Sequence, residues 1–304
     1  MITKTILITG ANGLLGQKLV QKLSGREAVQ LIATGLGPNR SASEEGYVYE
    51  KMDITDPASM RAIFEQYGPT DVINSAAMTN VDQCERDREG CLKLNVTAVE
   101  NLIALCKEFD AKLIHISTDF IFDGEDGPYS EKDTPNPLSY YGETKKIAED
   151  LLIASGLPYA IARTMLVYGL VADMSRSNIV LWAKGALEKG EKINVVNDQF
   201  RCPTLAEDLA EGVVLITMKD KQGVFHISGP DMHSIFDMAN IVADHWELDK
   251  SLITAIDSST LNQAAKRPPK TGFLILKAQT ELGYRPRTFK EGLQVLARQL
   301  TDDG

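Results

Sequence analysis

The sequence of 304 residues is 43% hydrophobic and carries a formal net charge of -10. A chain of this size can bury one large core, or one core and a smaller second lobe, so a disordered or fibrous protein is excluded. The acidic balance would repel phosphate backbones, and no Lys/Arg-rich run is present, which argues against nucleic acid as a partner.

Short apolar runs alternate with longer helical patterns through the first half of the chain. Strand-like runs occur at "TILIT", "LIAT", "DVINSAA", "KLIHIS" and "PYAIART", and helical patterns at 14–23, from "DPASMRAIF" and at 92–109. In the first helix, Leu15, Leu19 and Leu23 recur every fourth residue and form an apolar stripe. The alternation is typical of βαβ units, so we predict an α/β, Rossmann-type fold with a doubly wound parallel sheet.

After about residue 168 this alternation loosens. A helix is expected near 178–189, a strand at "KINVV", a helix from Leu205 and a strand at "VFHIS". We therefore predict a dinucleotide-binding domain over residues 1–167. Residues 168–304 are expected to form mainly a smaller substrate-binding lobe, with some segments returning to the Rossmann sheet.

The first strand ends in "TGANGLLG", a glycine-rich strand-to-helix turn. Glycine permits positive φ and a close approach of the backbone to a pyrophosphate, and the helix N-terminus supplies free N–H groups. A glycine triplet alone is weak evidence, but at the first strand of a βαβ unit it favours dinucleotide binding over a plain tight turn. The candidate cofactor-binding residues of this loop are Gly10, Asn12, Gly13, Leu14, Leu15 and Gly16.

The residues after the second strand bear on the choice of cofactor. Sites for NAD usually carry an acidic residue about 20 residues beyond the glycines, where it holds the ribose 2′-hydroxyl. No carboxylate follows that strand until Glu44, whereas Arg40 could face a 2′-phosphate. NADP(H) is therefore favoured over NAD(H), with the alternative that Arg40 is only a solvated loop charge.

The stretch "SYYGETKK" contains one tyrosine–lysine pair with the spacing of a single helix face. Side chains four residues apart lie one turn from each other, which pairs Tyr141 with Lys145. Tyr140 meets Thr144 at the same spacing instead. Without further context, an exposed amphipathic helix start would explain a lone YxxxK pattern as well.

The cysteines and histidines show no spacing typical of a disulfide framework or a metal site. Cys84, Cys91, Cys106 and Cys202 form no CxxC pattern, so we expect reduced and mostly buried thiols. His115 lies within an interior strand pattern, where a hydrogen-bonded core histidine is favoured over a metal ligand. No metal site is predicted.

The N-terminal residues run from Met1 directly into the strand pattern "TKTILITG", without a cationic flank, a long apolar stretch or a small-residue cleavage site. No later apolar run approaches the ~20 residues that a membrane span requires. We therefore expect a cytoplasmic protein that does not enter a membrane.

Seven motifs occur in the order found in the extended short-chain dehydrogenases/reductases. They are the GxxGxxG loop, "MDITD", "NSAAMTNVDQCE", "NVTAVENL", "STDFIFDG", "YYGETK" and "RTMLVYG". Within that superfamily the chain resembles the dTDP-4-dehydrorhamnose reductases. The resemblance is clear over roughly residues 1–230, includes "VVNDQFRCPTLAEDLA", and is fainter beyond.

The resemblance implies a catalytic group of Thr118, Tyr141 and Lys145. Lowering a tyrosine pKa of about 10 by about 3 units takes about 4 kcal/mol, and an ammonium about 4 Å away supplies an interaction of that size at an effective dielectric of roughly 20. Lys145 would thus lower the pKa of Tyr141 and also bind the nicotinamide ribose. Tyr141 would protonate a carbonyl oxygen as hydride reaches the carbon, with Thr118 orienting that oxygen.

The same resemblance implies further contacts with the cofactor. Asp53 and Ile54 should border the adenine, and Ala76 and Ala77 the ribose and pyrophosphate. The alternatives are an ordinary turn carboxylate and core packing. Asn95 should lie behind the site at the strand ends, where we favour a structural role for its amide.

Substrate contacts are predicted at Thr118, Asp119, Phe120 and Arg201. Related dehydratases carry an Asp–Glu pair after the threonine, whereas Asp119 is followed by Phe120, which favours reduction, with or without epimerisation, over dehydration. Many of these reductases have a tryptophan just before "VYG", but here that residue is Leu166, so the contacts with the substrate are expected to differ. Arg201 either meets a substrate phosphate or is a surface arginine.

The sequence therefore predicts NAD(P)H-dependent reduction of a 4-keto nucleotide sugar, with dTDP-4-dehydro-L-rhamnose as the candidate substrate and a homodimer as the candidate assembly. The enzyme alternatives are a nucleotide-sugar epimerase or a reductase of another carbonyl compound. A further alternative is a non-catalytic, NADP-binding subunit resembling the regulatory subunit of methionine adenosyltransferase, which would bind the cofactor without turnover.

Overall fold

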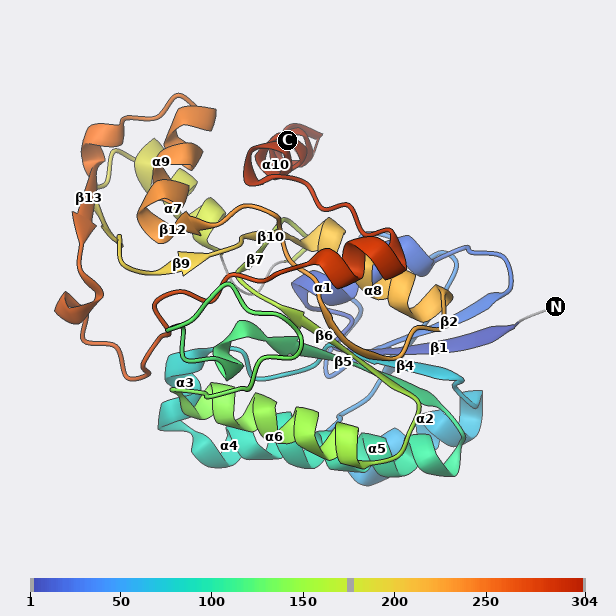
Figure 1. Cartoon of the computed structure of the whole chain (residues 1–304). Coiled ribbons are helices and arrows are strands. Elements are labelled where there is room, and N and C mark those ends of the chain that lie inside the picture. Colours follow the sequence, from blue (N-terminus) through green and yellow to red (C-terminus); the bar gives the residue numbers. More distant parts are fainter. Residues whose placement is uncertain (1–2, 174–177, 303–304) are drawn as a thin grey trace.

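The computed structural model describes residues 3–173 and 178–302, and a seven-stranded sheet lies at its centre (Figure 1). The strand order is β11-β6-β5-β4-β1-β2-β3, and every neighbouring pair runs parallel. The predicted doubly wound parallel sheet is thereby confirmed. Its strands are β1 (Lys4–Thr9), β2 (Val29–Gly35), β3 (Val48–Lys51), β4 (Asp71–Asn74), β5 (Lys112–Thr118), β6 (Tyr159–Thr164) and β11 (Gly223–His226).

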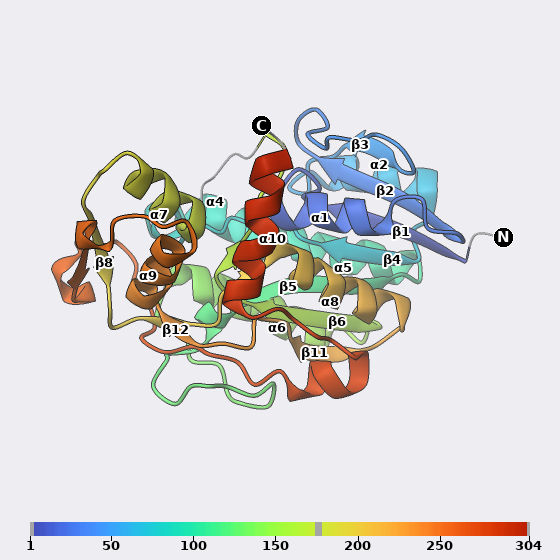
Figure 2. The ribbon, with the colours of Figure 1, turned by 90° about the horizontal axis from the view of Figure 1, so that it is seen from above.

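Helices cover both faces of the sheet (Figures 1 and 2). The helices α1 (Leu14–Leu23) and α8 (Ala206–Met218) pack together on one face, and α2 (Pro57–Tyr67), α5 (Ala98–Glu108) and α6 (Tyr140–Ala154) on the other. Successive strand residues point to opposite faces of the sheet. Ile6 and Ile8 therefore pack in the core under α1 and α8, and Leu7 packs in the core under α2, α5 and α6. Both faces are apolar, as a covered parallel sheet requires.

The start of α2 follows from local chemistry. Asp56 caps α2 by accepting a hydrogen bond from the amide of Ala58 at 3.0 Å, and Pro57 occupies the first helical position. The continuous helix expected over 92–109 is interrupted. A π-helical segment (Lys93–Thr97) lies between α4 (Arg88–Leu92) and α5, and α3 (Val81–Arg86) precedes α4.

A smaller lobe with its own apolar core lies beside the sheet (Figure 2). Within residues 168–304, α8 packs on α1 and β11 pairs with β6, so both belong to the layers of the main sheet. The remaining elements are β7 (Val167–Tyr168), α7 (Ile179–Glu188), β8 (Ile193–Val196), β9 (Phe200–Arg201), β10 (Thr204–Leu205), β12 (His233–Ser234), α9 (Ile235–His245), β13 (Ile253–Ile256) and α10 (Phe289–Asp302).

The expected state of the thiols is confirmed, since Cys84, Cys91, Cys106 and Cys202 are all free and buried. None of the helices in the described ranges combines the length and the apolar character that crossing a membrane demands.

Candidate active site

The strand order brings three chain segments together at one edge of the sheet. The strands β1, β4 and β5 are neighbours, and they end at Thr9, Asn74 and Thr118. In an open parallel sheet, ligands bind outside the carboxyl ends of the strands where the strand order reverses, and that point lies here between β1 and β4. The candidate residues at the ends of these strands therefore share one region.

A close approach of α6 to the turn after β5 places Tyr141 beside Thr118. Gly142 makes this approach possible, because a Cβ on Gly142 would lie 2.2 Å from the carbonyl oxygen of Phe120. Ser139 caps α6 by accepting from the amide of Gly142 at 3.2 Å. The Tyr141 and Thr118 side chains are hydrogen-bonded, and the rings of Tyr141 and Phe120 meet edge to face at 5.7 Å.

The environment of Tyr141 corrects one expectation. Burial raises the pKa of Tyr141 above its ordinary value, and the hydrogen bond with Thr118 lowers it only in part. The lowering expected from Lys145 is not found, because the Lys145 ammonium is directed at other partners. A raised pKa keeps the phenol protonated near neutral pH, which is the state that a proton donor requires.

Lys145 is buried, and its ammonium contacts two residues of β5. Its Nζ donates to the carbonyl oxygen of Ile116 at 2.7 Å and lies 2.9 Å from Nε2 of His115. Burial lowers the pKa of Lys145 to about 8, against the opposing effect of Glu149. The expectation of a hydrogen-bonded core histidine at 115 is confirmed, but its contact with Lys145 was not predicted. The only local signal is the place of His115 three residues before Thr118 on the same strand.

Asp119 connects Thr118 to the second half of the chain. Its Oδ1 accepts from Thr118 at 3.1 Å, its Oδ2 accepts from Thr271 at 2.5 Å, and the Nε of Arg201 lies 3.2 Å from Oδ2. Burial raises the pKa of Asp119, and Arg201 opposes that shift. Asp119 and Phe120 both lie near Tyr141. The guanidinium of Arg201 is 5.8 Å from the centre of the Phe120 ring.

The surface alternative for Arg201 is wrong, since the residue is only 3% exposed. Besides Asp119, its guanidinium donates to the carbonyl oxygens of Phe200, Pro268 and Pro269. Each of its three nitrogens therefore has a protein acceptor. Contact with a substrate phosphate stays a prediction.

The glycine loop has the tight geometry that a dinucleotide site needs. Gly10 has φ +69°, and a Cβ there would lie 2.8 Å from the amide nitrogen of Ala76. A Cβ on Gly16 would lie 2.2 Å from the carbonyl oxygen of Gly10. Gly13 precedes α1 and supplies no side-chain cap, so the first amides of the helix are available to a pyrophosphate. These residues fit a bound nicotinamide dinucleotide.

Asn12 joins this loop to the segment after β2. Its Oδ1 accepts from the backbone amide of Arg40 at 3.0 Å, and its Nδ2 donates to the Pro38 carbonyl at 2.9 Å and the Tyr49 hydroxyl at 2.8 Å. Arg40 is thereby held next to the glycine loop, where its side chain forms an exposed ion pair with Asp173 at 3.3 Å. This position suits the predicted contact with a 2′-phosphate.

The other candidate residues lie at neighbouring strand ends. Asp53 follows β3, and its Oδ1 accepts from the amide and the hydroxyl of Thr55, both at 2.8 Å. Ile54 is buried in the core, whereas Ala76 and Ala77, which follow β4, are half-buried. The remaining loop residues Leu14 and Leu15 begin α1.

Asn95 has the contacts expected of a structural amide. It lies in the π-helical segment, accepts from the amide of Met78 at 2.8 Å and donates to the carbonyl of the same residue at 3.1 Å. Its Nδ2 also donates to the Thr144 hydroxyl at 3.3 Å. The side chain therefore connects the segment after β4 to α6.

Sequence reasoning did not find that Leu166 has φ 40°, an uncommon conformation for leucine at the junction of β6 and β7.

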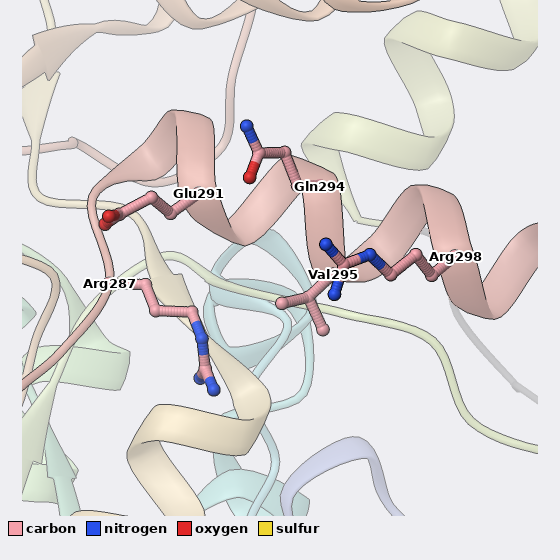
Figure 3. A pocket seen from close by; sticks show the side chains of 5 residues that line it. All are labelled: Arg287, Glu291, Gln294, Val295 and Arg298. Carbon is pink, nitrogen blue, oxygen red and sulfur yellow. The ribbon is translucent and has the colours of Figure 1, made fainter.

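A separate surface cavity of about 210 Å³ lies along α10 (Figure 3). None of its lining residues belongs to the group around Tyr141, and one of them, Arg287, is paired with Asp208. The lining residues are Arg287, Glu291, Gln294, Val295 and Arg298.

Comparisons with known proteins bear on the family and the fold of the chain. Residues 4–301 match the family model described as RmlD substrate binding domain. The solved structure of a dTDP-4-dehydrorhamnose reductase from Clostridium acetobutylicum is 30% identical, with 98% of this chain and 99% of that chain covered and a TM-score of 0.85. A dTDP-4-dehydrorhamnose reductase from Bacillus anthracis, solved in complex with NADP, is 25% identical, with 97% and 99% covered and a TM-score of 0.83.

The chain is also similar to a protein named methionine adenosyltransferase 2 subunit beta. The protein from Rattus norvegicus is 29% identical over 298 residues, which cover 96% of this chain and 86% of the relative. The family model spans nearly the whole sequence, so the chain belongs to the RmlD substrate-binding domain family.

Proposed function

We propose that this protein is an NADP(H)-dependent reductase of a 4-keto nucleotide sugar, with dTDP-4-dehydro-L-rhamnose as the substrate to test first. The observation that carries the proposal is the buried group of Thr118, Tyr141 and Lys145 at the strand ends that adjoin the glycine loop. The solved reductases that the chain resembles act, by their names, on dTDP-4-dehydrorhamnose, and one of them binds NADP.

The bound nicotinamide would supply the hydride, and the residues of this chain would manage the proton and the carbonyl oxygen. Tyr141, kept protonated by its raised pKa, donates its proton to the oxygen as negative charge develops there. Thr118, hydrogen-bonded to Tyr141, orients the same oxygen. Lys145 presents a buried ammonium on the same helix face, where it can bind the nicotinamide ribose.

The proposed cofactor preference rests on Arg40. Its backbone is fixed to the glycine loop through Asn12, and no acidic side chain precedes it in the segment between β2 and residue 44. A guanidinium in that position pairs well with a 2′-phosphate, which NADP(H) carries and NAD(H) lacks. NAD(H) would then bind more weakly rather than be excluded.

The proposed activity is tested by following NADPH oxidation with freshly generated dTDP-4-dehydro-L-rhamnose. Tyr141→Phe removes the acid, and a loss of about 10²–10⁴-fold in rate is expected. Tyr140→Phe is the matched control, because Tyr140 starts the same helix but stacks under Arg88 at the surface and should keep the wild-type rate. Equal rates for the two variants would contradict the role of Tyr141.

A second candidate function comes from the relative named methionine adenosyltransferase 2 subunit beta. A regulatory subunit would bind NADPH tightly, yet neither the rhamnose precursor nor other keto sugars would be turned over. The same assay therefore separates the two functions, since wild-type turnover that Tyr141→Phe abolishes excludes a purely non-catalytic role. The expected homodimer stays a prediction that light scattering of the purified protein measures.

A further inference from the structure

We propose that His115 is a positioning residue for Lys145: its neutral imidazole accepts a hydrogen bond from the Lys145 ammonium through Nε2 and directs its Nδ1 proton at the Asn74 side chain. The inference deepens the proposed function and depends on it only for the role of Lys145 at the cofactor. The His115–Lys145 hydrogen bond itself is a property of the folded chain.

Four buried polar side chains form one continuous row across the sheet. The Thr9 hydroxyl lies 2.6 Å from Asn74 Oδ1, Asn74 Nδ2 lies 3.1 Å from His115 Nδ1, and His115 Nε2 lies 2.9 Å from Lys145 Nζ. Thr9 and Asn74 are direct cross-strand partners, as are Asn74 and His115. None of the four is more than 2% exposed, so water does not compete for these hydrogen bonds.

The hydrogen-bond donors and acceptors at His115 and Lys145 determine the tautomer of the imidazole. An ammonium has three donors and no acceptor, so Nε2 of His115 must offer a lone pair to Lys145. Burial and the neighbouring Lys145 charge lower the pKa of His115 well below its ordinary value, so the imidazole is neutral and carries its one proton on Nδ1. That proton needs an acceptor, which the Asn74 side chain provides.

Asn74 can provide the acceptor without any change in its position. A half-turn of the side-chain amide exchanges its oxygen and nitrogen, after which Oδ1 accepts from His115 and Nδ2 donates to the Thr9 hydroxyl oxygen. In that arrangement each contact in the row joins one donor to one acceptor. The Asn74 amide and the Thr9 hydroxyl can each donate or accept, so they accommodate the Nδ1–H tautomer that the Lys145 ammonium requires at Nε2.

The other groups around Lys145 do not replace this acceptor. The titratable groups that face it are Tyr141 and Glu149 on α6, Cys91 on α4 and His115 on β5. Glu149 is engaged in a buried ion pair with Arg163 at 2.7 Å. Only His115 and the Ile116 carbonyl are hydrogen-bonded to the ammonium in the described residues. Loss of the imidazole should therefore favour the neutral amine and lower the Lys145 pKa.

The tautomer is measured first, by imidazole ¹⁵N NMR of the labelled, full-length protein, with His115→Gln used to assign the His115 signal. A neutral imidazole protonated on Nδ1 at pH near 7 is the expected result. A neutral imidazole protonated on Nε2, or an imidazolium, would overturn the proposal. This measurement needs neither cofactor nor substrate.

The functional consequence is measured through NADPH affinity as a function of pH, in wild type, His115→Leu and His115→Gln. Leucine removes the acceptor, so NADPH should bind about tenfold more weakly, the size expected for one hydrogen bond to a charged group. The pH above which affinity is lost should also fall by about 1 unit. Glutamine retains an acceptor oxygen, so His115→Gln should keep most of the wild-type NADPH affinity and a pH midpoint close to that of wild type.

Equal effects of the two substitutions, or an unchanged pH midpoint in His115→Leu, would overturn the proposal. If His115→Leu does not fold, a pH midpoint for His115→Gln close to that of wild type supports the proposal and a midpoint lowered by about 1 unit contradicts it. A wild-type protein that binds NADPH but reduces no ketone would count against the proposed function alone. The NMR result would still decide the tautomer if NADPH did not bind.

Discussion

Arg201 and Asp119 form an ion pair in the interior of the protein, with Nε 3.2 Å from Oδ2 and side chains only 4% and 3% exposed. The same carboxylate accepts a hydrogen bond from Thr118, so the pair links β9 to the end of β5. Removing one partner of a buried pair leaves an uncompensated charge, whose cost exceeds the net contribution of the intact pair. The arginine is thus a structural support of the site.

Arg201→Met should lower the free energy of unfolding by about 3–5 kcal/mol, because it leaves the Asp119 carboxylate buried without its cation. Urea denaturation measures the loss. Arg61→Met is the matched control, since Arg61 pairs with Glu108 at the surface, where the side chains are 46% and 50% exposed, and it should change stability far less than Arg201→Met. Similar losses in the two variants would contradict the buried pair.

Gly142→Ala should reduce the rate of ketone reduction by about 10²-fold, because a Cβ 2.2 Å from the Phe120 carbonyl must push α6 and Tyr141 away from Thr118. Gly185→Ala in α7 is the control, as its Cβ would meet nothing within 4 Å. That substitution should raise stability by about 0.5–1 kcal/mol and leave the rate unchanged. A wild-type rate in Gly142→Ala would show that the close approach is not needed.

Arg40→Ala should raise the dissociation constant of NADPH by about tenfold and leave that of NADH nearly unchanged, since only NADPH carries the 2′-phosphate. Fluorescence titration with each cofactor gives both constants. Arg26→Ala serves as the control, because Arg26 donates to the Lys22 carbonyl at the opposite end of α1. Equal weakening of both cofactors would instead indicate a general effect on the loop.

Stability should fall as the pH is lowered from about 6.5, in part because of His226. Burial, with Arg163 nearby, lowers its pKa to about 3, so between about pH 3 and 6.5 the unfolded chain binds a proton that the folded chain does not. The unfolded state binds more protons there, so stability decreases with falling pH by about 1.4 kcal/mol per unit.

His226→Phe should remove this contribution while keeping the stack on Phe273, where the ring centres are 3.8 Å apart. The loss of unfolding free energy between about pH 6.5 and pH 5 should then be smaller by about 2 kcal/mol. Urea titrations at both pH values measure it. His245→Gln should have a smaller effect, since His245 is only partly buried. An unchanged slope in His226→Phe would refute the assignment.

Local patterns in the sequence were sufficient for the sheet, the glycine loop and the Tyr141–Lys145 pair. A run of alternating strands and helices, a glycine that needs φ +69° and two side chains one helical turn apart are all properties of short segments. The interruption of the helix at Asn95 was missed, because apolar periodicity does not distinguish a π-helical turn from a continuous α-helix.

Contacts between distant segments needed the tertiary structure. His115 meets Lys145 across 30 positions and Asp119 meets Thr271 across 152, and each contact depends on which strands and loops become neighbours. Burial then reversed the expected direction of the Tyr141 pKa, because removal from water outweighs the hydrogen bond with Thr118 and Lys145 is bonded elsewhere. Residue types and spacings identified the candidate residues, whereas their protonation states follow from desolvation and from partners that only the folded chain brings together.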